Sequence, residues 1–353
     1  MIYNFLDRGM KVSLSRRSFM FGTSVSMGLL ASTSVSANQK DSGRGDRLRY
    51  QGLAGIILYP ELADALGYLA PLKLEWVGNT TSGPQDLQAA TTGDTDFGEA
   101  FNGAIMKLIV SGAPVKAVLA YGGADKLTSG SIFVRKASSL RAPRDLIGKT
   151  IGVNTLMAEH ECFIEQYLQA NGLTDTEIRS IILVAIPPVV AEQALRHGRV
   201  DAVVLSNVFR EVALQHNDLL ELTTEYALYG AGNTDSIILR NSYMEAWPQS
   251  ARHFTEATAR AISWAQTTPP DHVRTFLISL IKNRKRGEST LPARYWRSTS
   301  VVTRGGYIRP EDFARFQPWY AWRGDTRTAT LPADTFYTNT FNPEQTAQVI
   351  TPL

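Results

Sequence analysis

The chain has 353 residues, of which 44% are hydrophobic and 20% are charged, and this composition is typical of a globular protein with room for two domains. Residues 1–37 carry all of its formal net charge of +3, so the rest of the chain has no charge excess that would favour a nucleic acid or an anionic membrane as partner. No uncharged apolar run is long enough to span a bilayer, and we expect a monomer that does not insert into a membrane.

The first 37 residues predict an export signal. Residues 15–20 read SRRSFM, which resembles the twin-arginine motif, and a weakly apolar stretch follows over residues 21–30. Residues 35–37 read VSA and offer the small side chains at which a signal peptidase cuts. This order predicts a twin-arginine signal peptide over 1–37 and a polar linker over 38–46. The mature chain is then exported to the periplasm, where its single cysteine, Cys162, cannot form an intrachain disulfide.

The remaining chain alternates apolar runs with helical and strand spacing. We expect strands at Arg47–Tyr50, Leu72–Val77, Thr95–Ala100 and Val115–Ala120, and helices at Tyr59–Leu69, Gly83–Ala90 and Ala104–Val110. The alternation starts again with strands at Thr150–Val153, Ile181–Ala185 and Ala202–Leu205, and with helices at Glu159–Ala170 and Val189–Arg196. Strands that alternate with helices over short turns predict an α/β fold with parallel-rich sheets.

A repeated segment explains a triplet that otherwise suggests a metal site. Residues 96–98 read DFG, as in the magnesium-binding loop of protein kinases, but the other kinase motifs are absent from the sequence. Residues 87–102 align without a gap with residues 192–207, and the alignment matches Gly93 with Gly198, Asp96 with Asp201, and Asn102 with Asn207. We interpret each copy as a helix ended by glycine, a turn in which the aspartate accepts backbone N–H bonds, and a buried strand.

The two asparagines of the repeat follow the predicted carboxyl ends of strands. Ligands bind at these ends in open parallel sheets, so Asn102 and Asn207 are candidates to face each other across a cleft. The alternative is that each only caps the helix that follows it.

An ordered set of short motifs resembles one family of transport proteins. The residues that carry the resemblance are Val77-Gly78, Ser82-Gly83-Pro84, 90–98 (ATTGDTDFG), 112–118 (GAPVKAV), Ser139-Leu140, 145–153 (DLIGKTIGV), 171–173 (NGL) and 194–202 (ALRHGRVDA). In this order, over about residues 47–325, the chain resembles the periplasmic solute-binding proteins of the nitrate, sulfonate, taurine and thiamine-precursor group (SsuA/THI5-like, NMT1-like).

The resemblance implies the two-domain fold of a type II periplasmic binding protein with a two-strand hinge. The hinge strands would be 131–136 outward and 236–240 back. The first domain would comprise 47–137 and 231–325, the second 138–230, and 326–353 would form a C-terminal extension. Such proteins close on a small molecule and deliver it to an ABC permease driven by a cytoplasmic ATPase.

The candidate ligand-binding residues follow strand ends or begin helices. They are Tyr59, Ser82, Gly83, Glu99, Phe101, Asn102 and Tyr121 in the first domain, and Asn154, Thr155, Met157, Glu159, Ser206 and Asn207 in the second. Where sulfonate and nitrate binders tend to have a small Gly/Ser-rich turn, this chain has Glu159 and Glu161, which would repel an anion unless they serve only the helix dipole. We therefore expect a neutral or cationic organic ligand, such as a nitrogen heterocycle.

Other functions stay open at this point. The ligand alternatives are an alkanesulfonate, taurine or nitrate. A sensory binding subunit and an enzyme of the thiamine-pyrimidine synthase type are further alternatives, although the cysteine-rich segment of those enzymes is absent from the sequence. We expect no metal, because the five histidines lack ligand spacing, and no cofactor. We also expect no catalytic residues, because His160 and Cys162, two positions apart on a predicted helix, point in different directions.

Overall fold

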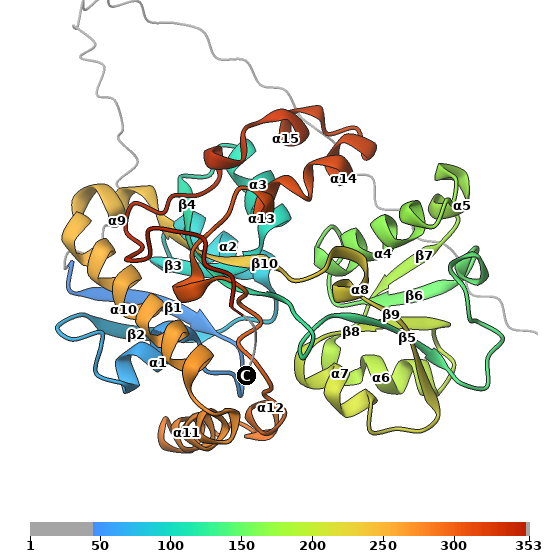
Figure 1. The fold of residues 1–353 in the computed structure, drawn as a ribbon, viewed down its shortest axis with the longest axis horizontal. Helices are drawn as coiled ribbons and strands as arrows, with labels where there is room; N and C mark the ends of the chain where they lie inside the picture. The colour runs from blue at the N-terminus through green and yellow to red at the C-terminus, as the bar shows by residue number, and fades with distance from the viewer. Residues whose placement is uncertain (1–44, 351–353) are drawn as a thin grey trace, which may run out of the picture. The chain divides into compact units, whose positions relative to one another are not determined.

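The computed structural model describes residues 45–350 (Figure 1). The predicted signal peptide lies outside the described residues. The strands are β1 (Arg47–Gly52), β2 (Lys73–Asn79), β3 (Phe97–Phe101), β4 (Val115–Ala124), β5 (Ser131–Arg135), β6 (Thr150–Val153), β7 (Ile182–Ala185), β8 (Ala202–Leu205), β9 (Leu219–Thr224) and β10 (Gly232–Arg240).

The α-helices are short in most cases. They are α1 (Tyr59–Ala65), α2 (Gly83–Thr92), α3 (Asn102–Val110), α4 (Glu159–Ala170), α5 (Asp175–Arg179), α6 (Pro188–Arg196), α7 (Asn207–Ala213), α8 (Glu225–Tyr229), α9 (Asn241–Ala246), α10 (Pro248–Thr267), α11 (Pro270–Asn283), α12 (Leu291–Arg294), α13 (Glu311–Ala314), α14 (Gln317–Trp322) and α15 (Thr326–Thr330). Their alternation with strands confirms the predicted α/β class.

Two lobes are built on separate sheets (Figure 1). The first lobe contains the parallel pair β1-β2 and the sheet β3-β10-β4, in which β10 runs antiparallel to both neighbours. The second lobe contains the sheet β7-β6-β8-β5-β9, in which β7, β6 and β8 are parallel and β5 is antiparallel to β8 and β9. Only the five-stranded sheet is mixed, whereas β3-β10-β4 contains antiparallel pairs alone, because the strand that follows each crossing runs against its neighbours.

The chain passes between the two sheets through residues 125–130 and 225–231. The crossings predicted at 131–136 and 236–240 are wrong. Ser131–Arg135 is β5, a full member of the second sheet, and residues 236–240 lie within β10 of the first sheet. Apolar alternation marks both segments as strands but does not reveal where the chain leaves one sheet for the other.

The repeated segments fold alike. Gly93 ends α2 with φ of 84°, and Gly198 lies in the turn after α6 with φ of 69°. Both values lie in the left-handed region that favours glycine. Each glycine also lies beside an arginine from outside the aligned segments: Arg240 at the end of β10, and Arg135 at the end of β5. A Cβ atom at Gly93 would lie 3.3 Å from the Arg240 guanidinium, and one at Gly198 would lie 3.3 Å from the Arg135 guanidinium.

Each repeated aspartate accepts a backbone N–H from a neighbouring strand. Asp96 Oδ2 accepts the backbone N–H of Arg49 at 2.8 Å, and the Asp96 N–H donates to the Arg49 carbonyl at 2.9 Å. Asp201 Oδ2 accepts the N–H of Thr150 at 2.9 Å, and the Asp201 N–H donates to the Thr150 carbonyl at 2.8 Å. Each aspartate therefore fixes the register of the strand beside it, which is a structural role without a metal.

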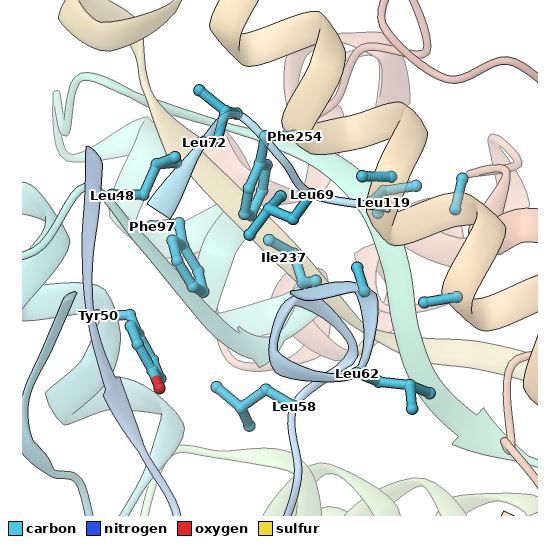
Figure 2. Close-up of a cluster of buried hydrophobic side chains, with 14 of the residues drawn as sticks. Leu48, Tyr50, Leu58, Leu62, Leu69, Leu72, Phe97, Leu119, Ile237 and Phe254 are labelled. Atoms are coloured by element: carbon cyan, nitrogen blue, oxygen red, sulfur yellow. The ribbon is translucent and has the colours of Figure 1, made fainter. Parts of the chain in front are cut away.

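The core of the first lobe lies between β1, β3, β10 and the helices α1 and α10. Figure 2 shows Phe254 of α10 above Phe97 and Ile237 of the sheet. The rings of Phe254 and Phe97 are 4.9 Å apart, and Tyr50 stacks on the other side of Phe97 at 5.5 Å. These fully or nearly fully buried side chains hold the strands whose ends carry the candidate site.

The described part of the predicted C-terminal extension, residues 326–350, packs on the first lobe. Phe336 is fully buried in a cluster with side chains of α3 and β4. Tyr337 pairs with Ala117 of β4 in a parallel bridge, and Val349 pairs with Thr303. The segment is therefore part of the fold that supports the sheet.

Candidate functional site

Three of the candidate residues of the first lobe lie together. The rings of Tyr59 and Tyr121 meet edge to face with centroids 5.6 Å apart, and the Tyr59 hydroxyl donates to the Thr299 carbonyl at 3.0 Å. The Tyr121 hydroxyl lies near the Glu99 carboxyl, and each group shifts the pKa of the other. The pairing of β4 with β10 shifts register at Tyr121, and such bulges redirect a side chain. The result is an acidic group bordered by two aromatic rings.

Glu99 is buried beside a second carboxyl that our sequence reasoning missed. Its backbone N–H donates to Asp86 Oδ2 at 2.7 Å, and Asp86 Oδ1 has no hydrogen-bond partner among the described residues. Burial raises the pKa of Asp86 to about 7. Burial, and then the charge of Asp86, raise the pKa of Glu99 well above its ordinary value. The sequence signal was weak, since an aspartate in a first helical turn is common.

Glu159 extends from the second lobe to the first. It begins α4, and its carboxyl lies near the side chain of Thr234 on β10; Thr234 Oγ1 donates to Asp235 Oδ2 at 2.8 Å. Burial raises the pKa of Glu159 well above its ordinary value, and the charges of Asp235 and Glu225 raise it further. Two carboxyl groups from opposite lobes therefore converge on one threonine.

Glu225 adds a third carboxyl at the returning crossing. Its Oε2 accepts the backbone N–H of Gly130 on the outgoing crossing at 2.9 Å. Burial raises the pKa of Glu225 to about 7, with a further contribution from Asp235, while the Arg315 guanidinium opposes the shift. Burial also raises the pKa of Asp235 to about 6. We call Glu159, Glu225 and Asp235 the interlobe carboxyl cluster; sequence reasoning included only Glu159.

His160 connects the ends of two strands in the second lobe. Its Nδ1 accepts the Asn154 backbone N–H at 3.3 Å, and its Nε2 lies 3.5 Å from Ser206 Oγ. Burial lowers the pKa of His160 to about 4, so the imidazole is neutral near pH 7. Asn154 and Ser206, two candidates from different loops, are thereby brought together. Thr155 lies beside them and donates its backbone N–H to Asn154 Oδ1 at 2.7 Å.

Two exposed candidates of the second lobe have left-handed backbone. Met157 has φ of 59° and Asn207 has φ of 51°. The side chain of Met157 is about half exposed, and its backbone N–H donates to Glu161 Oε2 at 2.7 Å. A non-glycine residue in this region costs about 1–3 kcal/mol and is enriched at functional loops.

Four candidates of the first lobe serve packing or helix geometry. Phe101 is in the core, with its ring 4.7 Å from that of Phe316, so it forms no exposed wall. Asn102 is fully buried and donates to the Asp312 carbonyl at 2.9 Å, so it neither faces Asn207 nor acts as the N-cap of α3. A Cβ atom at Gly83 would lie 2.9 Å from that of Ala100, so glycine allows α2 to approach β3. Ser82 is the N-cap of α2, and its side chain makes no capping hydrogen bond.

Residues 45–350 contain no group of three or more His, Cys, Asp or Glu arranged to hold a metal ion. Among the helices of this part of the chain, none is both long and apolar enough to cross a bilayer.

Comparisons with known proteins identify a matching family model and solved structures with a similar fold. The NMT1/THI5 like family model matches residues 62–272, which is more than half of the chain. No curated protein matches its sequence. The fold resembles that of the alkanesulfonate-binding protein SsuA from Xanthomonas axonopodis pv. citri bound to MOPS, with a TM-score of 0.62 and 19% identity over 82% of this chain and 97% of the other.

Two further solved structures are similar. The periplasmic aliphatic sulphonate binding protein SsuA from Escherichia coli has a TM-score of 0.60 and 20% identity over 84% of this chain and 99% of the other. The periplasmic nitrate-binding protein NrtA from Synechocystis PCC 6803 has a TM-score of 0.57 and 11% identity over 83% and 91%. At such identities the likeness establishes the two-domain binding-protein fold, and these relatives are binding proteins rather than enzymes.

Proposed function

The chain belongs to the NMT1/THI5-like family, and we propose that it is a periplasmic solute-binding protein of an ABC importer. It would be exported by the twin-arginine route, close its two lobes on a small molecule, and deliver that molecule to a permease driven by a cytoplasmic ATPase. The family match and the binding-protein relatives support this reading. The ligand we propose is a neutral or, preferably, a cationic organic molecule.

The interlobe carboxyl cluster carries the proposal about the ligand. Glu159 from the second lobe and Asp235 from the first meet at Thr234, with Glu225 close enough to raise the pKa of Glu159. A carboxylate removed from water is costly unless a cation or a proton neutralises it. In the free protein protons can do so, as the raised pKa values of all three acids indicate. An organic cation between the lobes would replace these protons and favour closure, since both lobes would contact it.

A second observation supports a ligand at this position. The hydroxyl of Tyr229, the last residue of α8, is buried and has no hydrogen-bond partner among the described residues. Burial raises the pKa of Tyr229 most, followed by the charges of Cys162, Glu225 and Glu159. The hydroxyl therefore lies near both acids. A buried hydroxyl without a partner is costly, and a polar group of a ligand would satisfy it. The Tyr59–Tyr121 pair would offer an apolar wall to a flat ligand.

The competing ligand class is an oxyanion. The Xanthomonas relative was solved with MOPS, and the Synechocystis relative is a nitrate-binding protein. A sulfonate near Glu159 and Asp235 would meet like charges, whose repulsion grows as the local dielectric falls. We therefore expect sulfonates and nitrate to bind weakly or not at all.

A thermal-shift screen of residues 38–353 tests the proposal. The panel contains amines, guanidines, pyrimidines, amino acids, alkanesulfonates, nitrate and bicarbonate. A ligand at 100 times its Kd adds about 2.7 kcal/mol of stability, which a melt detects. We expect a hit among the cationic or heterocyclic compounds. A hit only among sulfonates or nitrate would overturn the ligand class, and no hit in any class would count against solute binding itself.

Matched variants locate the site. Glu159→Gln removes a charge while keeping a side chain that can bond to Thr234, and we expect it to weaken binding of a cationic hit at least tenfold. Glu177→Gln is the control, because Glu177 pairs with Arg144 on the surface of the second lobe at 2.8 Å. Equal affinities of the two variants in calorimetry would place the ligand away from the cluster.

A further inference from the structure

Helix α14 contacts both lobes. It belongs to the first lobe, because the ring of Trp319 is fully buried there and the Tyr320 hydroxyl donates to the Gly103 carbonyl at 2.8 Å. Its other face meets α4 of the second lobe. Trp319 Nε1 donates to Glu165 Oε2 at 2.6 Å, and Cys162 of α4 lies in the same buried cluster as Trp319.

Arg323, directly after α14, extends this contact to the loop before α4. Its Nη1 donates to Glu161 Oε1 at 2.5 Å and to Glu165 Oε2 at 2.8 Å. Its Nη2 lies 2.8 Å from the Met157 sulfur. One first-lobe guanidinium therefore contacts two carboxylates of α4 and a side chain of the candidate ligand-binding loop.

Glu161 connects Arg323 with the backbone of Met157. Its Oε1 accepts from Arg323, and its Oε2 accepts the Met157 backbone N–H at 2.7 Å. Met157 has left-handed backbone, which is unfavourable by itself and persists where surrounding contacts hold it. If the lobes separate, Arg323 leaves with the first lobe, and Glu161 and Met157 lose the partner that they share.

We propose that Arg323 is a positioning residue that sets the conformation of the loop 154–158 when the two lobes are in contact. The guanidinium acts through Glu161 and Met157 and does not touch the ligand. Separation of the lobes would release the loop, so ligand release and loop relaxation would occur together. The proposal rests on lobe closure in the proposed function, but its effect on the loop exists without a ligand.

Three variants test the inference. Arg323→Gln removes the charge and the forked geometry, and Arg323→Lys keeps the charge alone. Arg144→Gln is the control, because it removes an Arg–Glu pair of 2.8 Å that lies within the second lobe. Hydrogen exchange by mass spectrometry follows peptides that cover residues 154–158 in the ligand-free protein. We expect exchange about fivefold faster in Arg323→Gln, with partial recovery in Arg323→Lys and no change in Arg144→Gln.

The same variants are then measured for binding to the compound found in the screen. We expect Arg323→Gln to raise Kd about fivefold to tenfold, mainly through a faster dissociation rate, with a melting temperature close to that of Arg144→Gln. Unchanged exchange at 154–158 in Arg323→Gln would overturn the inference, whether or not a ligand is known. Faster exchange across the whole chain would also overturn it, because Arg323 would then serve general stability. Failure of the screen alone would affect only the proposed function.

Discussion

The interlobe carboxyl cluster makes ligand affinity dependent on pH. A bound cation favours ionised carboxylates and lowers their pKa values in the complex, so binding releases protons and protons compete with the ligand. Asp235 has a pKa of about 6 in the free protein and Glu225 a pKa of about 7. Affinity should therefore rise as the pH rises from 5 to 8, because these acids lose their protons over this range.

The size of the change follows from the two pKa values. At pH 5 about one in ten Asp235 carboxyls is ionised, which weakens binding about tenfold if only this proton must leave. If Glu225 must ionise as well, the loss between pH 8 and pH 5 is larger than tenfold, because a second proton must leave. The number of protons released therefore distinguishes a ligand that contacts one acid from a ligand that contacts both.

Isothermal titration calorimetry at pH 5, 6, 7 and 8 measures this dependence. The ligand should carry a fixed charge, such as a quaternary ammonium or guanidinium group, so that its own titration does not contribute. Buffers that differ in ionisation enthalpy report the released protons directly. In Asp235→Asn, the change in Kd between pH 8 and pH 5 should be about tenfold smaller than in the unmodified protein. A Kd that is constant over this range, or that rises with pH, would refute a cation held by the cluster.

Two further predictions concern the fold. Phe254→Ala empties the centre of the first-lobe core and should lower the free energy of unfolding by about 3–5 kcal/mol, measured by urea unfolding, whereas the exposed Gln249→Ala at the start of the same helix should change it by less than about 0.5 kcal/mol. Gly93→Ala and Gly198→Ala should each cost about 1–2 kcal/mol, because both glycines have left-handed φ; a loss at only one of the two would contradict the equivalence of the repeats.

The local elements were predictable because their signals are local. The strands Thr150–Val153 and Ala202–Leu205 and the helix Glu159–Ala170 have the bounds that apolar spacing predicted. Helix α1 ends at Ala65, before the predicted end at Leu69, because Gly67 takes a left-handed turn with φ of 74°. A glycine inside an apolar period does not reveal its backbone conformation in advance.

The sequence by itself determined the alternation of strands and helices, the repeated helix–glycine–aspartate–strand unit and the family. Only the tertiary structure decided which side chains meet. Glu159 and Asp235 lie on different lobes, and their contact at Thr234 depends on how the chain crosses between the sheets. Phe101 is the last residue of β3, and it is buried because Phe316, far along the chain, covers it. Periodicity reports which side of its own element a residue faces, and the element opposite is set by long-range packing.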